Sequence, residues 1–81
     1  MMFNVHNFAE EMILLPDGRL QTKYAFSNGY HASVIVEENE TMEVALLDSE
    51  GKWIERPWFM DVEKCFTDQE VDQLLYKIHC H

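Results

Sequence analysis

The sequence is poor in basic side chains: six Lys and Arg stand against 15 Asp and Glu, and the formal net charge is −9 with histidine neutral. Nucleic-acid backbones and anionic membrane surfaces both attract basic patches, so this deficit argues against either as a direct partner. Long apolar runs are also lacking, and none approaches the ~20 residues that a membrane-spanning helix needs.

Cysteine, glycine and proline are scarce, with two, three and two residues. Cys65 and Cys80 allow one disulfide at most. The first residues carry no basic region followed by an apolar stretch, so no secretory signal is recognised, and we expect reduced thiols in a cytoplasmic protein. The three glycines lie in turn contexts rather than in a phosphate-binding loop, and no cofactor is expected.

The chain does contain enough apolar material to fold. Hydrophobic residues make up 47% of the sequence and aromatic residues 12%, which is too much for a disordered acidic tail. Because domains usually need about 100 residues, a chain of this length is predicted to form a single domain, residues 1–81.

The C-terminal third predicts a helix over residues 68–79. Thr67 and Glu70 have the spacing of a capping box, in which the threonine hydroxyl accepts a hydrogen bond from the Glu70 amide. Four apolar residues then repeat with the i, i+3, i+4, i+7 spacing of one helix face: Val71, Leu74, Leu75 and Ile78.

The middle of the chain predicts an antiparallel sheet. Asn28-Gly29 is the strongest signal for a two-residue hairpin loop, because a type I′ turn needs positive φ at both central positions. It joins strands predicted over 20–27 and 30–37. The expected cross-strand pairs are Ser27 with Tyr30, Phe26 with His31, and Tyr24 with Ser33.

Further strands are predicted on both sides of this hairpin. A third strand covers 42–48, and after a glycine turn a short edge strand covers 52–55, because the proline that follows prevents more pairing. Residues 12–15 are interpreted as a strand; a short helix starting at Asn7 is the alternative. The predicted fold class is α+β: an antiparallel β-meander of four to five strands with one C-terminal helix packed on one face.

Several short motifs follow one another in a recognisable order. They are Tyr24 to Tyr30, Ser33-Val34-Ile35, Glu43 to Asp48 with Gly51, Asp61-Val62, and Phe66-Thr67 through Glu70-Val71 and Leu74-Leu75. This order resembles a family of small acidic proteins of tailed bacteriophages whose function is unknown, over residues 23–78. The resemblance implies no activity and no catalytic residues. It implies a phage accessory protein that acts in the host bacterial cytoplasm.

Residues with catalytic potential have simpler explanations. His79-Cys80-His81 are metal-ligand types, but three consecutive residues at a chain end lack the paired spacing of a zinc site. Cys65 lies among Asp61, Glu63 and Asp68, and these acids oppose the low thiol pKa that a nucleophile needs. The many adjacent carboxylates indicate a solvated surface rather than an acid–base pair. No catalytic or metal site is predicted.

Acidic residues concentrate between residues 24 and 51, where the sequence contains no Lys or Arg. Two interpretations are open: the acids keep the protein soluble, or they project a negative field that attracts a basic partner. Four cluster at one link and two lie in the next turn, at the opposite end of the third strand: Glu37, Glu38, Glu40 and Glu43, then Asp48 and Glu50.

The segment 53–60 is rich in aromatic residues. Trp and Met are common at protein interfaces, so Trp53, Trp58 and Phe59 are candidate partner-binding residues. The alternatives are that the segment closes an open end of the core, or that it forms the self-association surface of a homodimer.

The function predicted from the sequence is a non-enzymatic, phage-type accessory protein that binds a bacterial host protein through the acidic residues and modulates or inhibits it. One alternative is a DNA mimic, whose carboxylates would imitate phosphates and block a nucleic-acid-binding host protein. Mimicry requires regular rows of acids along one face, whereas the sequence offers a cluster. A small metal-dependent hydrolase is the least favoured alternative.

Overall fold

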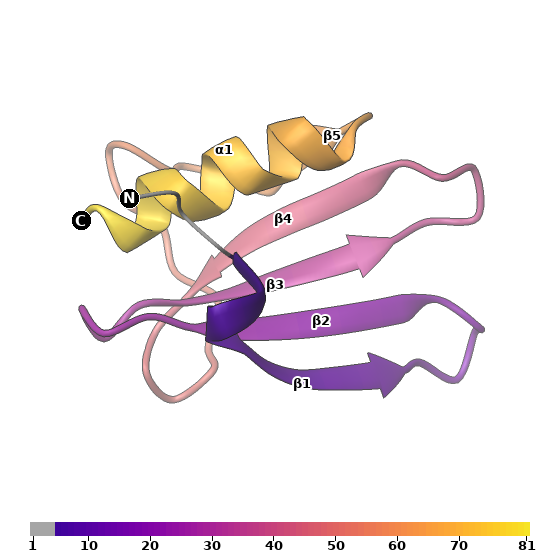
Figure 1. The fold of residues 1–81 in the computed structure, drawn as a ribbon, viewed down its shortest axis with the longest axis horizontal. Helices are drawn as coiled ribbons and strands as arrows, with labels where there is room; N and C mark the ends of the chain where they lie inside the picture. The colour runs from indigo at the N-terminus through magenta and orange to yellow at the C-terminus, as the bar shows by residue number, and fades with distance from the viewer. Residues whose placement is uncertain (1–4) are drawn as a thin grey trace.

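The computed structural model describes residues 5–81, which form one antiparallel sheet with a helix on one face (Figure 1). The strands pair in sequence order, β1-β2-β3-β4-β5. The α+β meander predicted from the sequence is confirmed. The elements are η1 (Val5–Phe8), β1 (Ala9–Leu14), β2 (Leu20–Ala25), β3 (His31–Val36), β4 (Met42–Leu47), β5 (Glu63–Cys65) and α1 (Asp68–His79).

Helix α1 begins and ends where the sequence predicts. The Thr67 hydroxyl accepts a 3.2 Å hydrogen bond from the Glu70 amide, so the cap is formed. Leu75 and Ile78 are fully buried, and they pack on the sheet together with Val71. The sheet contributes alternate residues of its central strands to this core: Tyr24, Ala32, Val34, Met42, Val44 and Leu46.

Four connections of the chain use the same three-residue loop. In each, the residue before the loop and the residue after it are joined by a backbone hydrogen bond, and the third loop residue donates its amide to the residue before the loop. The third loop residue has positive φ in every case, which is the geometry of a turn followed by a bulge. These residues are Gly18 (91°), Gly29 (90°), Glu40 (67°) and Gly51 (83°).

The prediction of a type I′ turn at Asn28-Gly29 is wrong. Among residues 5–81, Glu40 is the one non-glycine residue with positive φ, so Asn28 does not adopt the required conformation. Gly29 alone supplies the left-handed position, and the loop gains one residue. The register therefore moves by one from the predicted pairing, and it places Phe26 with Tyr30, Ala25 with His31, and Tyr24 with Ala32.

Both edges of the sheet also differ from the prediction. The expected edge strand over 52–55 does not form; within it, Trp53 makes an isolated bridge to Leu47. The chain turns back at 56–59 and returns to pair as β5 beside β4. At the other edge, β1 begins at Ala9, and a 3₁₀ turn precedes it in place of the alternative helix. No helix in the described part of the chain is long and apolar enough to cross a membrane.

Candidate functional site

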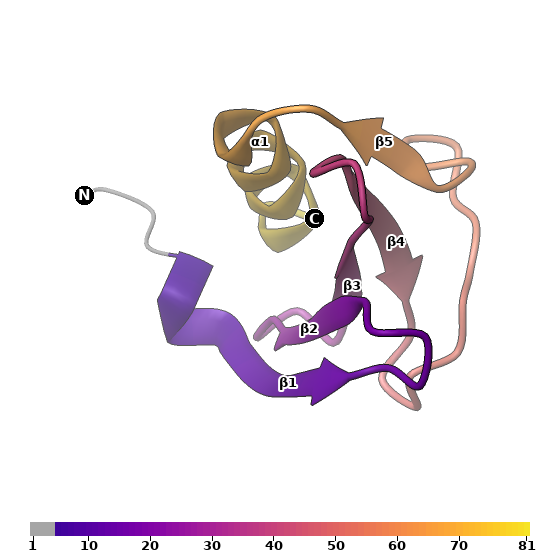
Figure 2. The ribbon, with the colours of Figure 1, turned by 90° about the vertical axis from the view of Figure 1, so that its right-hand side faces the viewer.

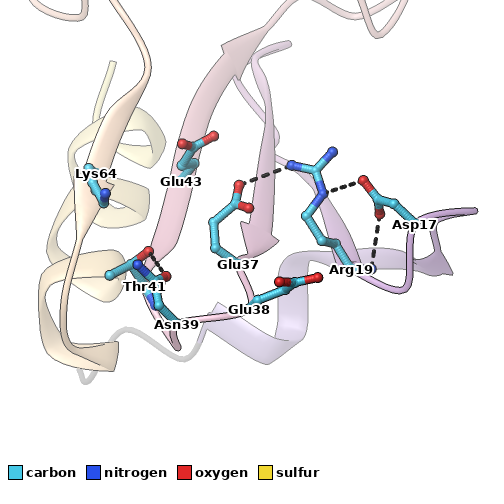
Figure 3. Close-up of a pocket in the computed structure, with 8 residues that line it drawn as sticks. All are labelled: Asp17, Arg19, Glu37, Glu38, Asn39, Thr41, Glu43 and Lys64. Carbon is cyan, nitrogen blue, oxygen red and sulfur yellow. Dashed lines mark hydrogen bonds and ion pairs between the residues drawn. The ribbon is translucent and has the colours of Figure 1, made fainter.

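The loop between β3 and β4 forms one wall of an open pocket of about 600 Å³ (Figure 3). Three of the four clustered acids line it, whereas Glu40 lies in the loop without lining the pocket. The structure therefore brings the predicted acidic cluster together. The lining residues are Asp17, Arg19, Glu37, Glu38, Asn39, Thr41, Glu43 and Lys64.

The strands set the spacing of these side chains. Glu43 on β4 is paired with Lys64 on β5, so an acidic and a basic residue share one face of the sheet, and both line the pocket. Within the loop, the Asn39 carboxamide oxygen accepts hydrogen bonds from the Thr41 hydroxyl (2.6 Å) and the Thr41 amide (3.3 Å). These bonds link the second loop residue to the residue that follows the loop.

Arg19 neutralises part of the cluster. Its guanidinium lies 2.7 Å from the Asp17 carboxylate and 3.0 Å from the Glu37 carboxylate. The backbone and side-chain hydrogen bonds that Arg19 donates lower the pKa of Asp17, although its partial desolvation acts in the opposite direction. Glu37 is thus engaged in an ion pair within the protein.

Sequence reasoning missed Arg19 because it lies 18 residues before Glu37. The usable signal was indirect: both residues flank a turn, and in a meander those two turns meet at the same end of the sheet. Charge counting along the chain does not reveal such a pair, because it depends on which strands are neighbours.

Glu38 and Glu40 are both exposed at the tip of the loop. Glu40 has φ 67°, where each of the other three loops has glycine. A left-handed conformation costs an ordinary L-residue about 1–2 kcal/mol. Such strain gathers at functional positions, so this glutamate is a candidate contact residue.

Asp48 and Glu50 do not belong to this site. They lie in the loop after β4, at its opposite end. The Asp48 carboxylate accepts hydrogen bonds from the amides of Lys52 and Glu50, each at 2.9 Å. These bonds, that of Lys52 first, lower the pKa of Asp48. Asp48 therefore stabilises this turn. The Glu50 carboxylate lies 3.4 Å from the Lys52 ammonium.

The predicted aromatic residues also lie away from the acidic pocket and have different environments. Phe59 is buried in the core, and Trp58 stacks on His81 with ring centroids 3.7 Å apart. Phe59 belongs to the core cluster, and Trp58 packs against it. Trp53 and Met60 are half exposed, with 50% and 57% of their surface accessible.

Cys65 is a core residue. It is 2% exposed, and burial raises the pKa of its thiol above the usual 9.0, with Glu70 and Glu63 adding to the shift. A neutral thiol is a weak nucleophile. Within residues 5–81, no group of three or more His, Cys, Asp and Glu side chains is arranged to hold a metal ion.

The fold and the pocket define a small α+β protein with an acidic hairpin end. No protein-family model matches the sequence, and neither the curated proteins nor the solved structures include a significant match. The resemblance to the tailed-phage proteins stays a prediction.

Proposed function

We propose that the protein is a non-enzymatic binding protein whose acidic hairpin end recognises a basic segment of a bacterial host protein and thereby modulates or inhibits it. The observation that carries this proposal is Glu40. A carboxylate occupies a backbone position that favours glycine, in the loop that already carries Glu37 and Glu38. Folding alone would be served better by glycine there.

The pocket suits a long basic side chain. Glu38 and Glu43 line it from the loop and from β4, and a lysine or arginine of the partner would place its charge between their carboxylates. Arg19 and Lys64 line the same pocket, so positive charge is already fixed at two points. A partner must fit between these cations, and repulsion by them would discriminate among basic partners.

The phage and host part of the proposal is supported by the resemblance of residues 23–78 to small tailed-phage proteins. DNA mimicry has less support. A phosphate-like row of carboxylates would be interrupted by Arg19 and Lys64, and two of the six predicted acids lie at the other end of β4.

The test is affinity capture from bacterial lysate with three forms of the protein at about 50 and 300 mM salt. The site variant removes three carboxylates of the hairpin end: Glu38→Gln, Glu40→Gln and Glu43→Gln. The control variant removes three exposed carboxylates elsewhere, and its net charge is the same: Glu55→Gln, Asp61→Asn and Glu63→Gln.

We expect a specific host protein to bind the wild type and the control variant, to be lost with the site variant, and to bind less at the higher salt concentration. Equal retention by both variants would overturn the proposed surface. Equal loss with both would show that net charge, rather than this pocket, attracts the captured protein.

A further inference from the structure

One helix does not cover the whole sheet. Five strands about 4.8 Å apart span about 19 Å, whereas a helix with its side chains is about 10 Å wide. Figure 2 shows α1 on the side of β3, β4 and β5, which it contacts, while β1 lies at the opposite side of the sheet. The turn η1 also contacts α1 and buries Val5, so among the described residues α1 and η1 together leave the helix-facing side of β1 and the adjoining part of β2 uncovered.

The part of this face that no described element covers is apolar. Cross-strand pairs place Met12 beside Thr22, which in turn pairs with the core residue Val34. Leu14 is connected in the same way, through Leu20, to Val36. Because directly paired residues share a face, these side chains continue the floor of the core. Met12 is 66% exposed, Leu14 73% and Val36 38%.

A groove of about 390 Å³ lies between this face and α1. Thr22, Tyr24 and Val36 line it from the sheet, and Asp68 and Asp72 line it from the helix. The turn η1 also lines it, with Val5 and His6. The two aspartates are four residues apart, so they lie one turn from each other along the same side of α1. The groove therefore combines an apolar floor with one acidic wall.

We propose that this groove, together with the exposed side of β1 next to it, binds an amphipathic helix of a partner protein, with its apolar stripe on Val36 in the groove and on Met12 and Leu14 of β1, and with basic residues along the edge that faces Asp68 and Asp72. A helix fits because its apolar stripe can pack on the exposed side of β1 while one edge faces the groove beside α1. A basic edge fits because the wall is acidic. A second copy fits poorly, since it would bring another net charge of −9 to the same place.

The proposal is independent of the acidic hairpin pocket. Among the described residues, the two cavities share no lining residue. The variants that test one surface leave the other intact, so the failure of one proposal is distinguishable from the failure of the other.

The probe is a synthetic peptide of about 18 residues of leucine and lysine, ordered so that one helix face is leucine and its borders are lysine. A second peptide has the same composition in an order without a stripe. Binding to the full-length protein is measured by isothermal titration calorimetry. We expect the striped peptide to bind at least about tenfold more tightly than the shuffled one.

Variants locate the binding surface. Met12→Ser with Leu14→Ser should weaken binding of the striped peptide about tenfold, because both side chains are exposed in the unbound protein and their loss removes contact area. Asp72→Asn should weaken it severalfold and reduce its salt dependence. Met60→Ser with Val62→Ser, a matched pair of exposed apolar residues away from the groove, should leave binding unchanged.

Three results would overturn the proposal. One is equal affinity for the striped and shuffled peptides, since that shows attraction by charge alone. Another is unchanged binding by the Met12 and Leu14 variant while circular dichroism confirms its fold. The third is sedimentation of the wild type as a dimer that this variant converts to a monomer, because a second copy would then be the occupant.

Discussion

Glu40 adopts a left-handed backbone conformation that residues other than glycine disfavour. Its φ of 67° is the conformation that Gly18, Gly29 and Gly51 adopt at the same position of their loops. An added Cβ meets no atom within 4 Å at any of these glycines, so the cost of a side chain there is conformational rather than steric crowding by neighbours. The same conformational cost applies to Glu40.

Replacing Glu40 by glycine should stabilise the fold by about 0.5–1.5 kcal/mol, because it removes the left-handed strain. The greater entropy of the unfolded chain offsets part of this gain. Gly51→Glu should destabilise the protein by a comparable amount. Urea denaturation monitored by tryptophan fluorescence measures both changes. Glu40→Gln separates charge from backbone: a gain in stability as large as that of glycine would refute the argument from strain.

At the scale of elements, the β2–β3 loop is tied to the end of α1. The Asn28 carboxamide nitrogen donates hydrogen bonds to the carbonyl oxygens of Ile78 (2.8 Å) and His79 (3.2 Å). Its oxygen accepts from the Tyr30 amide. One side chain thus stabilises its own loop and also donates to two carbonyl groups at the end of α1, of which that of Ile78 also accepts a hydrogen bond from the His81 amide.

Asn28→Asp should destabilise the protein by about 1–3 kcal/mol. The substitution keeps the acceptor for Tyr30, but it removes the donor to α1 and places a negative charge at the negative end of the helix dipole. Amide hydrogen exchange should speed up at Cys80 and His81, which bond within the last turn. Asn39→Asp is the control, because Asn39 has the same loop position and uses only its acceptor oxygen in the bonds described above. Equal losses in both variants would contradict this role.

At the scale of the whole molecule, the core holds two groups that resist ionisation. Burial, the first cause in each case, raises the pKa of Cys65 above 9.0 and that of Tyr24 above 10.0, and nearby carboxylates add to both shifts. The unfolded chain releases these protons near the usual pKa values, whereas the folded protein keeps them to higher pH. The contribution of these two groups to the free energy of unfolding is therefore fully present below about pH 9 and is lost as the pH rises through the folded pKa values.

We expect the free energy of unfolding to be nearly constant between pH 7 and 8 with respect to these two groups and to decline from about pH 9 to pH 11. Urea titrations at fixed ionic strength measure this decline. Cys65→Ala should start from a lower stability, because it leaves a small cavity, and should show a shallower alkaline decline. An equal slope for the variant and the wild type would exclude Cys65 as a cause.

Local patterns in the sequence were enough to predict α1 and the general course of the sheet. The capping pair Thr67 and Glu70 and the apolar repeat that follows depend on residues within four positions of one another, so helical geometry alone connects them. The glycine turns and the aromatic and β-branched segments likewise predicted antiparallel strands, and this class of fold is confirmed. The sequence also placed four acids at one link, and the structure brings three of them to one pocket.

The tertiary structure decided what depends on distant partners. The hairpin register followed from one extra loop residue, β5 formed because the chain turned back at 56–59, and Arg19 reached Glu37 because two turns share one end of the sheet. The uncovered apolar face of β1 is likewise invisible in the sequence, since its exposure results from the width of one helix against five strands. Short-range spacing determined α1 and the strands on either side of the central hairpin loop; pairing across the sheet determined the register, β5 and which surfaces are exposed.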